Sequence, residues 1–228
     1  MQFFSYFVTR VVDEWGTTTY RMTYMGMYAI VTTIVILLLA SSIFFGWRKR
    51  FEAIQLAFSS MTVSFAYIVS VIRLYRFPMG GSVTLFSMLV LSLIGYWYGL
   101  GAGILTGICY GLLQMLLDPY LMTPAQVVTD YVLAFGALGI SGFFAGPSRH
   151  NLTQAYIAAV CGRFFFSVLS GCLFFSQYAE AAGYSSPLRY SIVYNGTYLG
   201  AEALIGVLLI QIPIVKKALD FLERHAKE

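Results

Sequence analysis

The sequence predicts an all-α integral membrane protein, in which a six-helix bundle is preceded by an amphipathic helix and one additional transmembrane helix. Only 11% of the 228 residues are charged and 59% are hydrophobic, whereas a soluble domain carries about 25% charged residues. Seven apolar segments of membrane-spanning length follow one another, mostly separated by short polar breaks. Basic residues are distributed unevenly among these breaks, as the positive-inside rule predicts for a multi-pass protein.

Residues 1–23 precede the spans and are predicted to form the amphipathic helix. A helix with one apolar face lies either at a membrane surface or against the flank of its own protein, and the pattern leaves both possibilities open. The segment is not a signal peptide, because the charged n-region is missing and the next apolar run is too long. The apolar positions at helical spacing are Phe3, Phe4, Phe7, Val8, Val11, Val12 and Trp15.

The predicted spans divide the rest of the chain into three parts. The first span and the basic loop after it make residues 24–50 an additional transmembrane helix. The other six spans form a membrane domain over residues 51–213, and residues 214–228 form a basic tail. The spans are predicted at 24–46, 53–72, 82–98, 100–117, 124–146, 154–178 and 190–213.

The basic residues predict how the chain crosses the membrane. Arg48, Lys49 and Arg50 form the densest basic cluster, and such clusters stay in the cytoplasm. Counting spans from this loop places the N-terminus outside and the C-terminus in the cytoplasm. The six spans of the membrane domain then begin and end on the cytoplasmic side.

Glycines recur every four residues from the end of the third span through the fourth. A glycine stripe lets helices approach closely in lipid, where no hydrophobic force draws them together. We therefore predict that this stripe is a helix-packing surface. Its members are Gly95, Gly99, Gly103, Gly107 and Gly111.

Asp130 is the most unusual residue of the fifth span. Inserting a charge into a membrane costs about 2.5–3.5 kcal/mol, so a carboxylate inside a span predicts a functional site. Asp130 shares a helix face with the small residues Ala134, Ala137 and Ser141, which belong at a helix contact. Asp130 is therefore predicted to point into the bundle and not toward lipid.

Two more spans carry polar residues at helical spacing. The sixth aligns Arg163, Ser167 and Ser170, and the seventh aligns Ser191, Asn195, Tyr198 and Glu202. With the orientation above, Asp130 and Asn195 lie ~9 Å and ~8 Å below the outer ends of their spans. Arg163 and Glu202 lie deeper, and two opposite charges at similar depth predict a structural ion pair.

The outer layer is also rich in aromatic residues, and two explanations compete for them. An aromatic belt at the membrane interface is the usual one. Together with a buried carboxylate and an asparagine, the layer also suits a flat, cationic, nitrogen-rich ligand, which stacks on aromatic faces and needs one counter-charge. The aromatic residues are Tyr110, Tyr131, Phe174, Phe175, Tyr178, Tyr190 and Tyr194.

The sequence contains none of the motifs that predict catalysis or ATP hydrolysis. No Ser–His–Asp set, HExxH motif, paired intramembrane aspartates or Walker A loop is present. The cysteines have no metal-ligand spacing. We therefore expect no enzyme activity, no metal, no cofactor and no nucleic-acid partner.

Four segments resemble a known family, the thiamine-specific S component (ThiT/YuaJ) of energy-coupling factor importers. These segments are GGSVTLFSML at Gly80–Leu89, the glycine helix running into GICYGLLQMLLDP, FFSQYA at Phe174–Ala179 and YSIVYNGTY at Tyr190–Tyr198. The resemblance covers residues ~50–213. It implies a six-helix S-component bundle in a bacterial cell membrane that binds thiamine. It also implies a transmembrane coupling protein and two ATPase subunits as partners in an ABC importer.

The resemblance also implies the substrate-binding residues. The family's tyrosine and asparagine fall on Tyr190 and Asn195, and its acidic residue falls on Asp130, where the family has glutamate. A family histidine falls on Ser167, and two family tryptophans fall on Phe175 and Tyr110. Substrate would enter from outside and lie between the fifth, sixth and seventh spans, with the 73–82 loop as a lid. A thiamine precursor or a thiamine phosphate fits the same pattern.

Two other functions remain open on the residues alone. Asp130 is also the kind of residue that a stand-alone, ion-coupled secondary carrier uses as its proton site. A non-transporting scaffold subunit would instead use the glycine stripe and the N-terminal helix to gather membrane partners. Small-molecule binding separates the scaffold from the other two functions, and uptake driven by a pH gradient separates the carrier from the S component.

Overall fold

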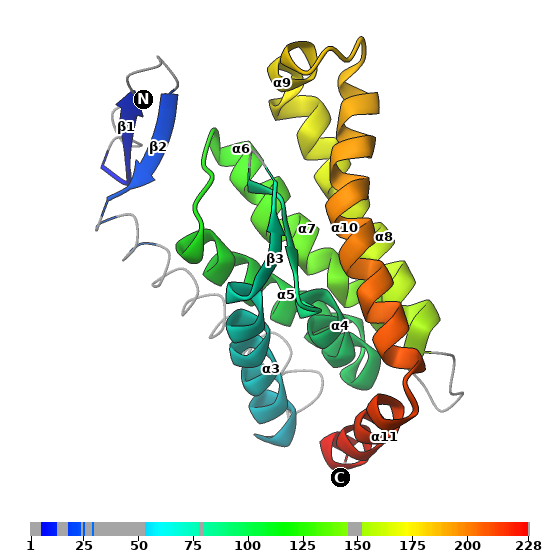
Figure 1. The fold of residues 1–228 in the computed structure, drawn as a ribbon. Helices are drawn as coiled ribbons and strands as arrows, with labels where there is room; N and C mark the ends of the chain where they lie inside the picture. The colour runs from blue at the N-terminus through cyan, green and yellow to red at the C-terminus, as the bar shows by residue number, and fades with distance from the viewer. Residues whose placement is uncertain are drawn as a thin grey trace.

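The computed structural model describes residues 6–12, 18–23, 25, 29, 53–77, 80–145 and 152–227. The additional transmembrane helix predicted for residues 24–50 falls almost entirely outside the described residues, and so does its basic loop. The fold is therefore described from the N-terminal segment and from residue 53 onward (Figure 1).

The N-terminal segment contains two strands where the sequence predicted an amphipathic helix, so that prediction was wrong. Strand β1 (Val8–Val12) pairs in antiparallel register with β2 (Thr18–Met22), with Val8 opposite Met22. The backbone N–H of Thr23 donates to the carbonyl of Phe7 and extends the pairing. The β-branched and aromatic residues of both segments favour strands, and this preference outweighed the helical spacing of the apolar residues.

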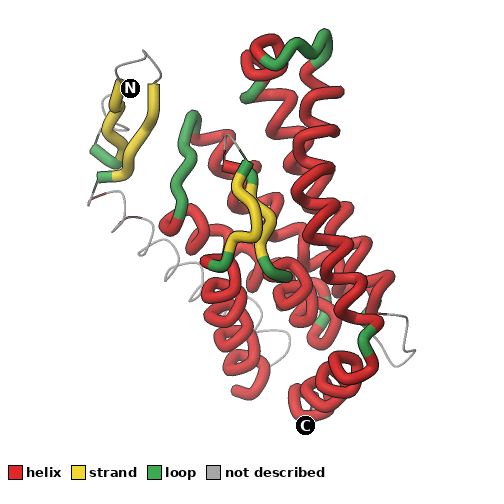
Figure 2. Tube along the Cα trace, viewed as in Figure 1, coloured by secondary structure: helices red, strands yellow, loops and turns green. Residues whose placement is uncertain are grey.

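Residues from 53 onward form a helical membrane bundle, and five of its helical segments are long and apolar enough to span a membrane. They are Ala53–Val71, Leu100–Leu117, Ala125–Phe144, Leu152–Phe174 and Pro187–Gln211. Figure 2 shows these helices as the bulk of the described chain. The protein is therefore a multi-pass membrane protein. The predicted spans at 53–72, 100–117, 124–146, 154–178 and 190–213 are confirmed within a few residues.

The remaining predicted span of the membrane domain, 82–98, has a different structure. Its first residues form strand β4 (Ser82–Thr84), and only α4 (Ser87–Tyr98) is helical. Strand β4 pairs with β3 (Arg73–Arg76), which follows helix α3 (Ala53–Val71). The resulting β3–β4 hairpin lies across the bundle between α3 and α10 (Pro187–Gln211), and it contacts both helices (Figure 1).

The fifth predicted span is helical along its length but changes helix type three times. It begins as α6 (Pro124–Val127), becomes the π-helix η2 (Val128–Leu133), passes through α7 (Ala134–Gly136) and ends as the 3₁₀-helix η3 (Ala137–Phe144). A π-helical turn holds more residues than an α-helical one, so it changes the direction of the side chains within it. Asp130 is in this π-helical turn.

The glycine stripe packs α5 (Leu100–Leu117) against the 125–144 helix, as the sequence predicted. A Cβ on Gly107 would meet the carbonyl group of Phe135, and one on Gly111 would meet the carbonyl oxygen of Tyr131. Gly99 has a φ of +94°, which allows the tight turn between α4 and α5. The stripe thus brings the backbone of α5 against the helix that carries Asp130.

Replacing Gly107 by alanine is expected to destabilise the bundle by about 1–3 kcal/mol, because the methyl group would meet backbone atoms that cannot move aside. The matched control is Gly200→Ala on α10, where an added Cβ meets nothing within 4 Å. The control should be neutral or slightly stabilising. Thermal unfolding of both variants in detergent checks the prediction, and equal apparent Tm values for the two would contradict it.

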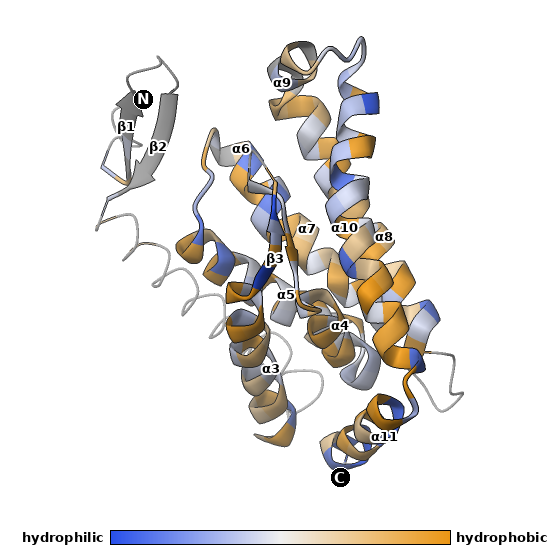
Figure 3. Ribbon diagram, viewed as in Figure 1, coloured by the Kyte–Doolittle hydropathy of each residue, from blue (hydrophilic) through white to orange (hydrophobic). Residues whose placement is uncertain are grey.

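The predicted basic tail is mostly helical. Helix α11 (Pro213–Lys227) follows α10 after the extended residue Ile212. It lies at the end of the bundle away from α9 (Ser176–Ala181), where it contacts α3 and α4 (Figure 1). Hydropathy colouring shows apolar surfaces along α3, α8 (Leu152–Phe174) and α10, and both apolar and polar residues on α11 (Figure 3).

Candidate ligand-binding site

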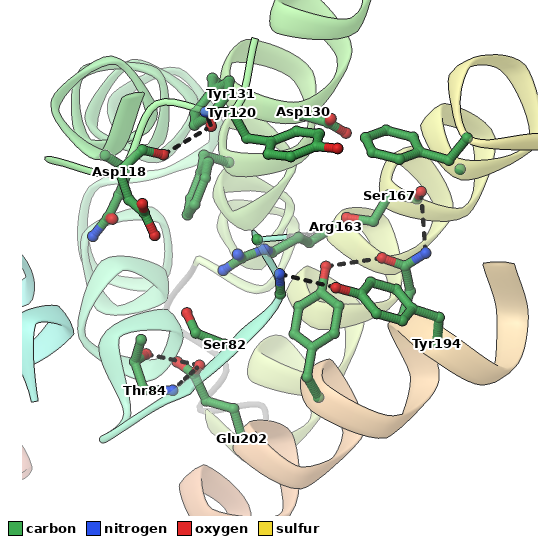
Figure 4. A pocket seen from close by; sticks show the side chains of 18 of the residues that line it. Ser82, Thr84, Asp118, Tyr120, Asp130, Tyr131, Arg163, Ser167, Tyr194 and Glu202 are labelled. Carbon is green, nitrogen blue, oxygen red and sulfur yellow. Dashed lines mark hydrogen bonds between the residues drawn. The ribbon is translucent and has the colours of Figure 1, made fainter. Parts of the chain in front are cut away.

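A cavity of about 150 Å³ lies between the β3–β4 hairpin, α5, the 118–123 loop, η2, α8 and α10. All three predicted polar stripes contribute to its wall: Asp130 from the fifth span, Arg163 and Ser167 from the sixth, and residues of α10 from the seventh. Figure 4 shows these side chains converging from separate helices. The lining includes Arg73, Gly81, Ser82, Thr84, Tyr110, Asp118, Tyr120, Gln126, Asp130, Tyr131, Phe135, Arg163, Ser167, Phe175, Tyr190, Ser191, Tyr194, Asn195, Tyr198 and Glu202.

All six residues that the sequence nominated for substrate binding line this cavity: Asp130, Asn195, Tyr190, Phe175, Ser167 and Tyr110. They are spread over 86 positions of the chain, from 110 to 195, and helix packing brings them together. Tyr110 is almost fully buried and packs against Phe135, with 5.2 Å between the ring centroids. The location of the six residues agrees with the sequence analysis, and their contact with a ligand remains a prediction.

The carboxylate of Asp130 has a protein hydrogen bond but no ion pair. Gln126, one helical turn earlier, donates its amide to Oδ2 of Asp130 at 2.5 Å. No Lys or Arg among the described residues forms an ion pair with Asp130. The hydroxyl of Ser191, which lines the cavity, is also buried and lacks a hydrogen-bond partner in the described part of the chain. Buried polar atoms of this kind are costly unless a ligand or water satisfies them.

The predicted ion pair between Arg163 and Glu202 is not formed. Glu202 is only 2% exposed, and its carboxylate accepts four hydrogen bonds from the start of α4 and from the strand before it. The donors are the N–H and hydroxyl of Thr84, the hydroxyl of Ser87 and the N–H of Met88, at 2.7–3.1 Å. The N-terminus of a helix favours a negative charge, so Glu202 is satisfied without a cation.

Arg163 therefore lines the cavity without an acidic partner among the described residues. Its guanidinium carbon lies 4.1 Å from the ring centroid of Phe135, in a cation–π contact. Its Nε atom is buried and has no hydrogen-bond partner in the described chain. Among the charged residues of the cavity wall, Asp130 and Arg163 are the two that form no ion pair and receive no set of helix-capping hydrogen bonds within the described chain.

Asn195 connects two of the helices that form the cavity. Its side-chain amide donates to the carbonyls of Ser167 on α8 and Ser191 on α10, at 3.3 and 2.9 Å. Its oxygen accepts a hydrogen bond from the hydroxyl of Tyr198 at 2.8 Å. Both amide protons are therefore in use. Only the oxygen of Asn195, which has a second lone pair, remains available to a ligand.

Aromatic rings form two stacked pairs along the cavity. Phe175 stacks on Tyr120 with 5.7 Å between centroids, and Tyr190 stacks on Tyr194 at 5.8 Å, both with interplanar angles of 21°. Burial raises the pKa of Tyr120, and its hydrogen bond with Tyr178 raises it further, so the hydroxyl is neutral at physiological pH. Tyr120 was missed in the sequence because it lies in the loop between two spans.

The β3–β4 hairpin lies over the cavity and is held at two places. The N–H of Gly81 donates to the hydroxyl of Tyr194 at 3.0 Å. At the other strand, Arg73 and Arg76 both pair with the carboxylate of Asp118 at 2.7 Å. A Cβ on Gly81 would lie 2.6 Å from the Tyr194 hydroxyl, so glycine is needed for this close approach. These contacts place the predicted lid against the cavity.

Comparison with known proteins identifies the family. The sequence model described as "Thiamine transporter protein (Thia_YuaJ)" matches residues 56–221. This chain belongs to the thiamine transporter protein family. A relative from Bacillus subtilis (strain 168), the thiamine transporter ThiT, is 33% identical over 147 residues, which cover 58% of this chain and 74% of that protein.

A solved structure supports the fold assignment of this family member. ThiT from Listeria monocytogenes superposes with a TM-score of 0.63 at 24% sequence identity, covering 76% of this chain and 97% of the other. The family match begins at residue 56, within α3, and therefore excludes the N-terminal hairpin and the predicted additional span. It ends at residue 221, within α11.

Proposed function

We propose that this protein binds thiamine in the cavity between the β3–β4 hairpin and helices α5, α8 and α10. The family match and the thiamine transporter from B. subtilis support the ligand. Asp130 carries the proposal: its carboxylate lines an aromatic cavity without an ion pair, as a site for a cationic ligand requires.

Thiamine has three chemical properties that these residues can recognise: a positive charge, flat rings and hydrogen-bonding groups. Its thiazolium ring is a permanent cation, for which Asp130 supplies the counter-charge. Its two flat rings suit the stacked pairs formed by Phe175 with Tyr120 and by Tyr190 with Tyr194. Its aminopyrimidine nitrogens and hydroxyethyl group need hydrogen-bond partners, which the hydroxyls of Ser167 and Ser191 in the cavity wall can provide.

We further propose that Arg163 contacts the ligand, whereas Asn195 contributes mainly by holding α8 to α10. The guanidinium of Arg163 has an unsatisfied Nε and can donate to a ring nitrogen or to an oxygen of the ligand. Tyr110 would act as an aromatic wall, because it is almost completely buried.

The protein would act as the S component of an energy-coupling factor importer. The sequence has no ATP-binding loop, so ATP-driven uptake would require separate ATPase subunits and a transmembrane coupling protein. The basic clusters predict that the C-terminus lies in the cytoplasm. In that orientation the cavity, which is lined by residues from the N-terminal half of α10, would open toward the outside, as uptake requires.

Titration of the purified protein with thiamine by calorimetry tests the proposal. We expect submicromolar binding of thiamine and weaker binding of its separate pyrimidine and thiazole precursors. Absence of binding to all three would exclude the proposed site. Uptake by the protein alone in liposomes, driven by a pH gradient, would show a secondary carrier instead of a subunit that depends on ATPases.

Asp118→Asn is expected to make bound thiamine dissociate about five- to tenfold faster, because each of the ion pairs to Arg73 and Arg76 is worth up to about 1 kcal/mol at a partly exposed site. Stopped-flow displacement of thiamine by excess competitor measures this rate. Lys227→Gln is the control, since it removes the 2.7 Å ion pair to Glu223 on α11, far from the cavity. If both variants release thiamine at the unchanged rate, the hairpin is not held closed by Asp118.

A further inference from the structure

Helix α11 lies at one end of the membrane bundle, directly after the last span. Only Ile212 separates it from α10, and this residue is extended, so the chain changes direction at the point where the span ends. From there α11 runs below α4 toward the lower end of α3 in the view of Figure 1, and it contacts both helices. Helix α11 therefore directly follows a segment that is long and apolar enough to span the membrane.

One part of the apolar face of α11 packs against the bundle. Ala226 is 1% exposed, and its carbonyl accepts a hydrogen bond from the hydroxyl of Tyr98 at 2.6 Å. Leu219 packs against the cluster of apolar residues around Trp97. These contacts fix the rotation of α11 about its own axis, and therefore also fix where its other residues point.

A second part of the apolar face is exposed, and the ring of Phe221 there contacts the ring of His225 on α11 itself, with 4.2 Å between centroids. Ile214, Phe221 and Leu222 are 75%, 60% and 41% exposed. Their spacing of seven and eight residues places them on one side of the helix. Leu204 and Leu208 of α10, and Ile212 between the two helices, are also exposed. In a multi-pass membrane protein such an exposed apolar surface faces lipid.

The remaining face of α11 is charged, with more basic than acidic residues. Lys227 forms an ion pair with Glu223, one turn earlier, at 2.7 Å. Lys216 and Lys217 lie in the first turn, next to the end of the span. Bilayer surfaces that contain anionic lipids attract basic residues at this position. The charged residues are Lys216, Lys217, Asp220, Glu223, Arg224 and Lys227.

We propose that α11 is a membrane-interface helix that binds the anionic lipid surface at this end of the bundle. Ile214, Phe221 and Leu222 insert at the boundary between the headgroups and the acyl chains, while Lys216 and Lys217 contact lipid phosphates. An amphipathic helix with a basic polar face has the properties that such binding requires. Because its other side is packed against α3 and α4, α11 also fixes how deeply these helices sit in the bilayer.

Fluorescence quenching in nanodiscs tests the insertion. Phe221→Trp adds a reporter on the exposed apolar face, and Asp220→Trp adds one on the charged face. After subtraction of the unsubstituted protein, lipids brominated on their acyl chains should quench the reporter at 221 and leave the one at 220 largely unquenched. Iodide in the buffer should do the reverse. If iodide quenches both reporters equally, the face is open to water or to a protein partner, and the proposal fails.

Hydrogen exchange of the unsubstituted protein tests the role of charge without any substitution. Residues 213–227 should exchange more slowly in nanodiscs that contain phosphatidylglycerol than in those of phosphatidylcholine alone. The double variant Lys216→Gln/Lys217→Gln should lose this difference, since each lysine near an anionic surface contributes about a fivefold effect. Equal exchange of the unsubstituted protein in both lipids would overturn the electrostatic part of the proposal.

Discussion

Replacing Asp130 by asparagine is expected to weaken thiamine binding by at least about 30-fold. Removing one member of a desolvated charge pair costs about 2–5 kcal/mol, and each 1.4 kcal/mol corresponds to about tenfold in affinity. Asp130 is the acidic residue of the cavity that has neither an ion pair nor a set of backbone donors within the described chain. The loss of its negative charge is therefore expected to weaken the binding of the cationic ligand. Calorimetric titration of the purified variant measures the change.

Asp130→Glu is the matched control, because it keeps the charge and adds one methylene group. It should retain thiamine binding within about tenfold. A neutral ligand of similar shape should bind the wild-type protein and Asp130→Asn with similar affinity, since no charge pair is lost. Tight thiamine binding by Asp130→Asn would show that this carboxylate is not the counter-charge, and the proposed site would need another anion.

Glu202→Gln is expected to lower the stability of the fold by about 2–3 kcal/mol. Each carboxylate oxygen accepts a backbone N–H: one from Met88 at 3.0 Å and the other from Thr84 at 3.1 Å. In either orientation, the NH₂ group of glutamine would face one of these N–H donors and leave it unsatisfied. For a chain of this length the apparent Tm should fall by roughly 5–10 °C.

Arg163→Met separates this explanation from the ion pair that the sequence suggested. If Glu202 depended on Arg163, the two substitutions would destabilise the protein to a similar extent, because each would leave a buried charge unpaired. The four hydrogen bonds to Glu202 predict instead that Arg163→Met shifts the apparent Tm much less. It should weaken thiamine binding, which calorimetry measures on the same samples. If both substitutions lower the apparent Tm equally, the result would favour an ion pair between Arg163 and Glu202 and contradict this prediction.

The two intramembrane acids show why some site residues were predictable and others were not. Both were conspicuous in the sequence, because a charge inside an apolar span is rare. The assignment of Asp130 to the cavity followed from the small residues on its helix face. The partners of Glu202 could not be assigned, because they lie 114–118 residues earlier in the chain, at a helix N-terminus whose position only the packed fold defines.

Local preference and helical periodicity conflicted at two places. The structure has strands at Val8–Val12 and Thr18–Met22, where the sequence analysis expected a helix, and at Arg73–Arg76 and Ser82–Thr84, where it expected a loop running into a span. Short runs of β-branched and aromatic residues fit either structure until a partner strand is available. The π-helical turn at Asp130 is likewise invisible in the sequence, because it depends on the shape of the neighbouring helices.

The resemblance to a known family supplied the set of six candidate binding residues. The sequence by itself determined the membrane class, the extent of most spans, the glycine packing stripe and the inward direction of Asp130. It could do so because a bilayer imposes span lengths, and because charges and polar stripes inside it are costly. Only the tertiary structure decided that Glu202 accepts hydrogen bonds from the start of α4, and that Arg163 lines the cavity without an acidic partner among the described residues. It alone also decided that a hairpin held by Asp118 lies over the cavity that contains Asp130. The physical reason is that hydrogen bonds and ion pairs between distant segments depend on ångström-scale geometry, which hydropathy and periodicity do not contain.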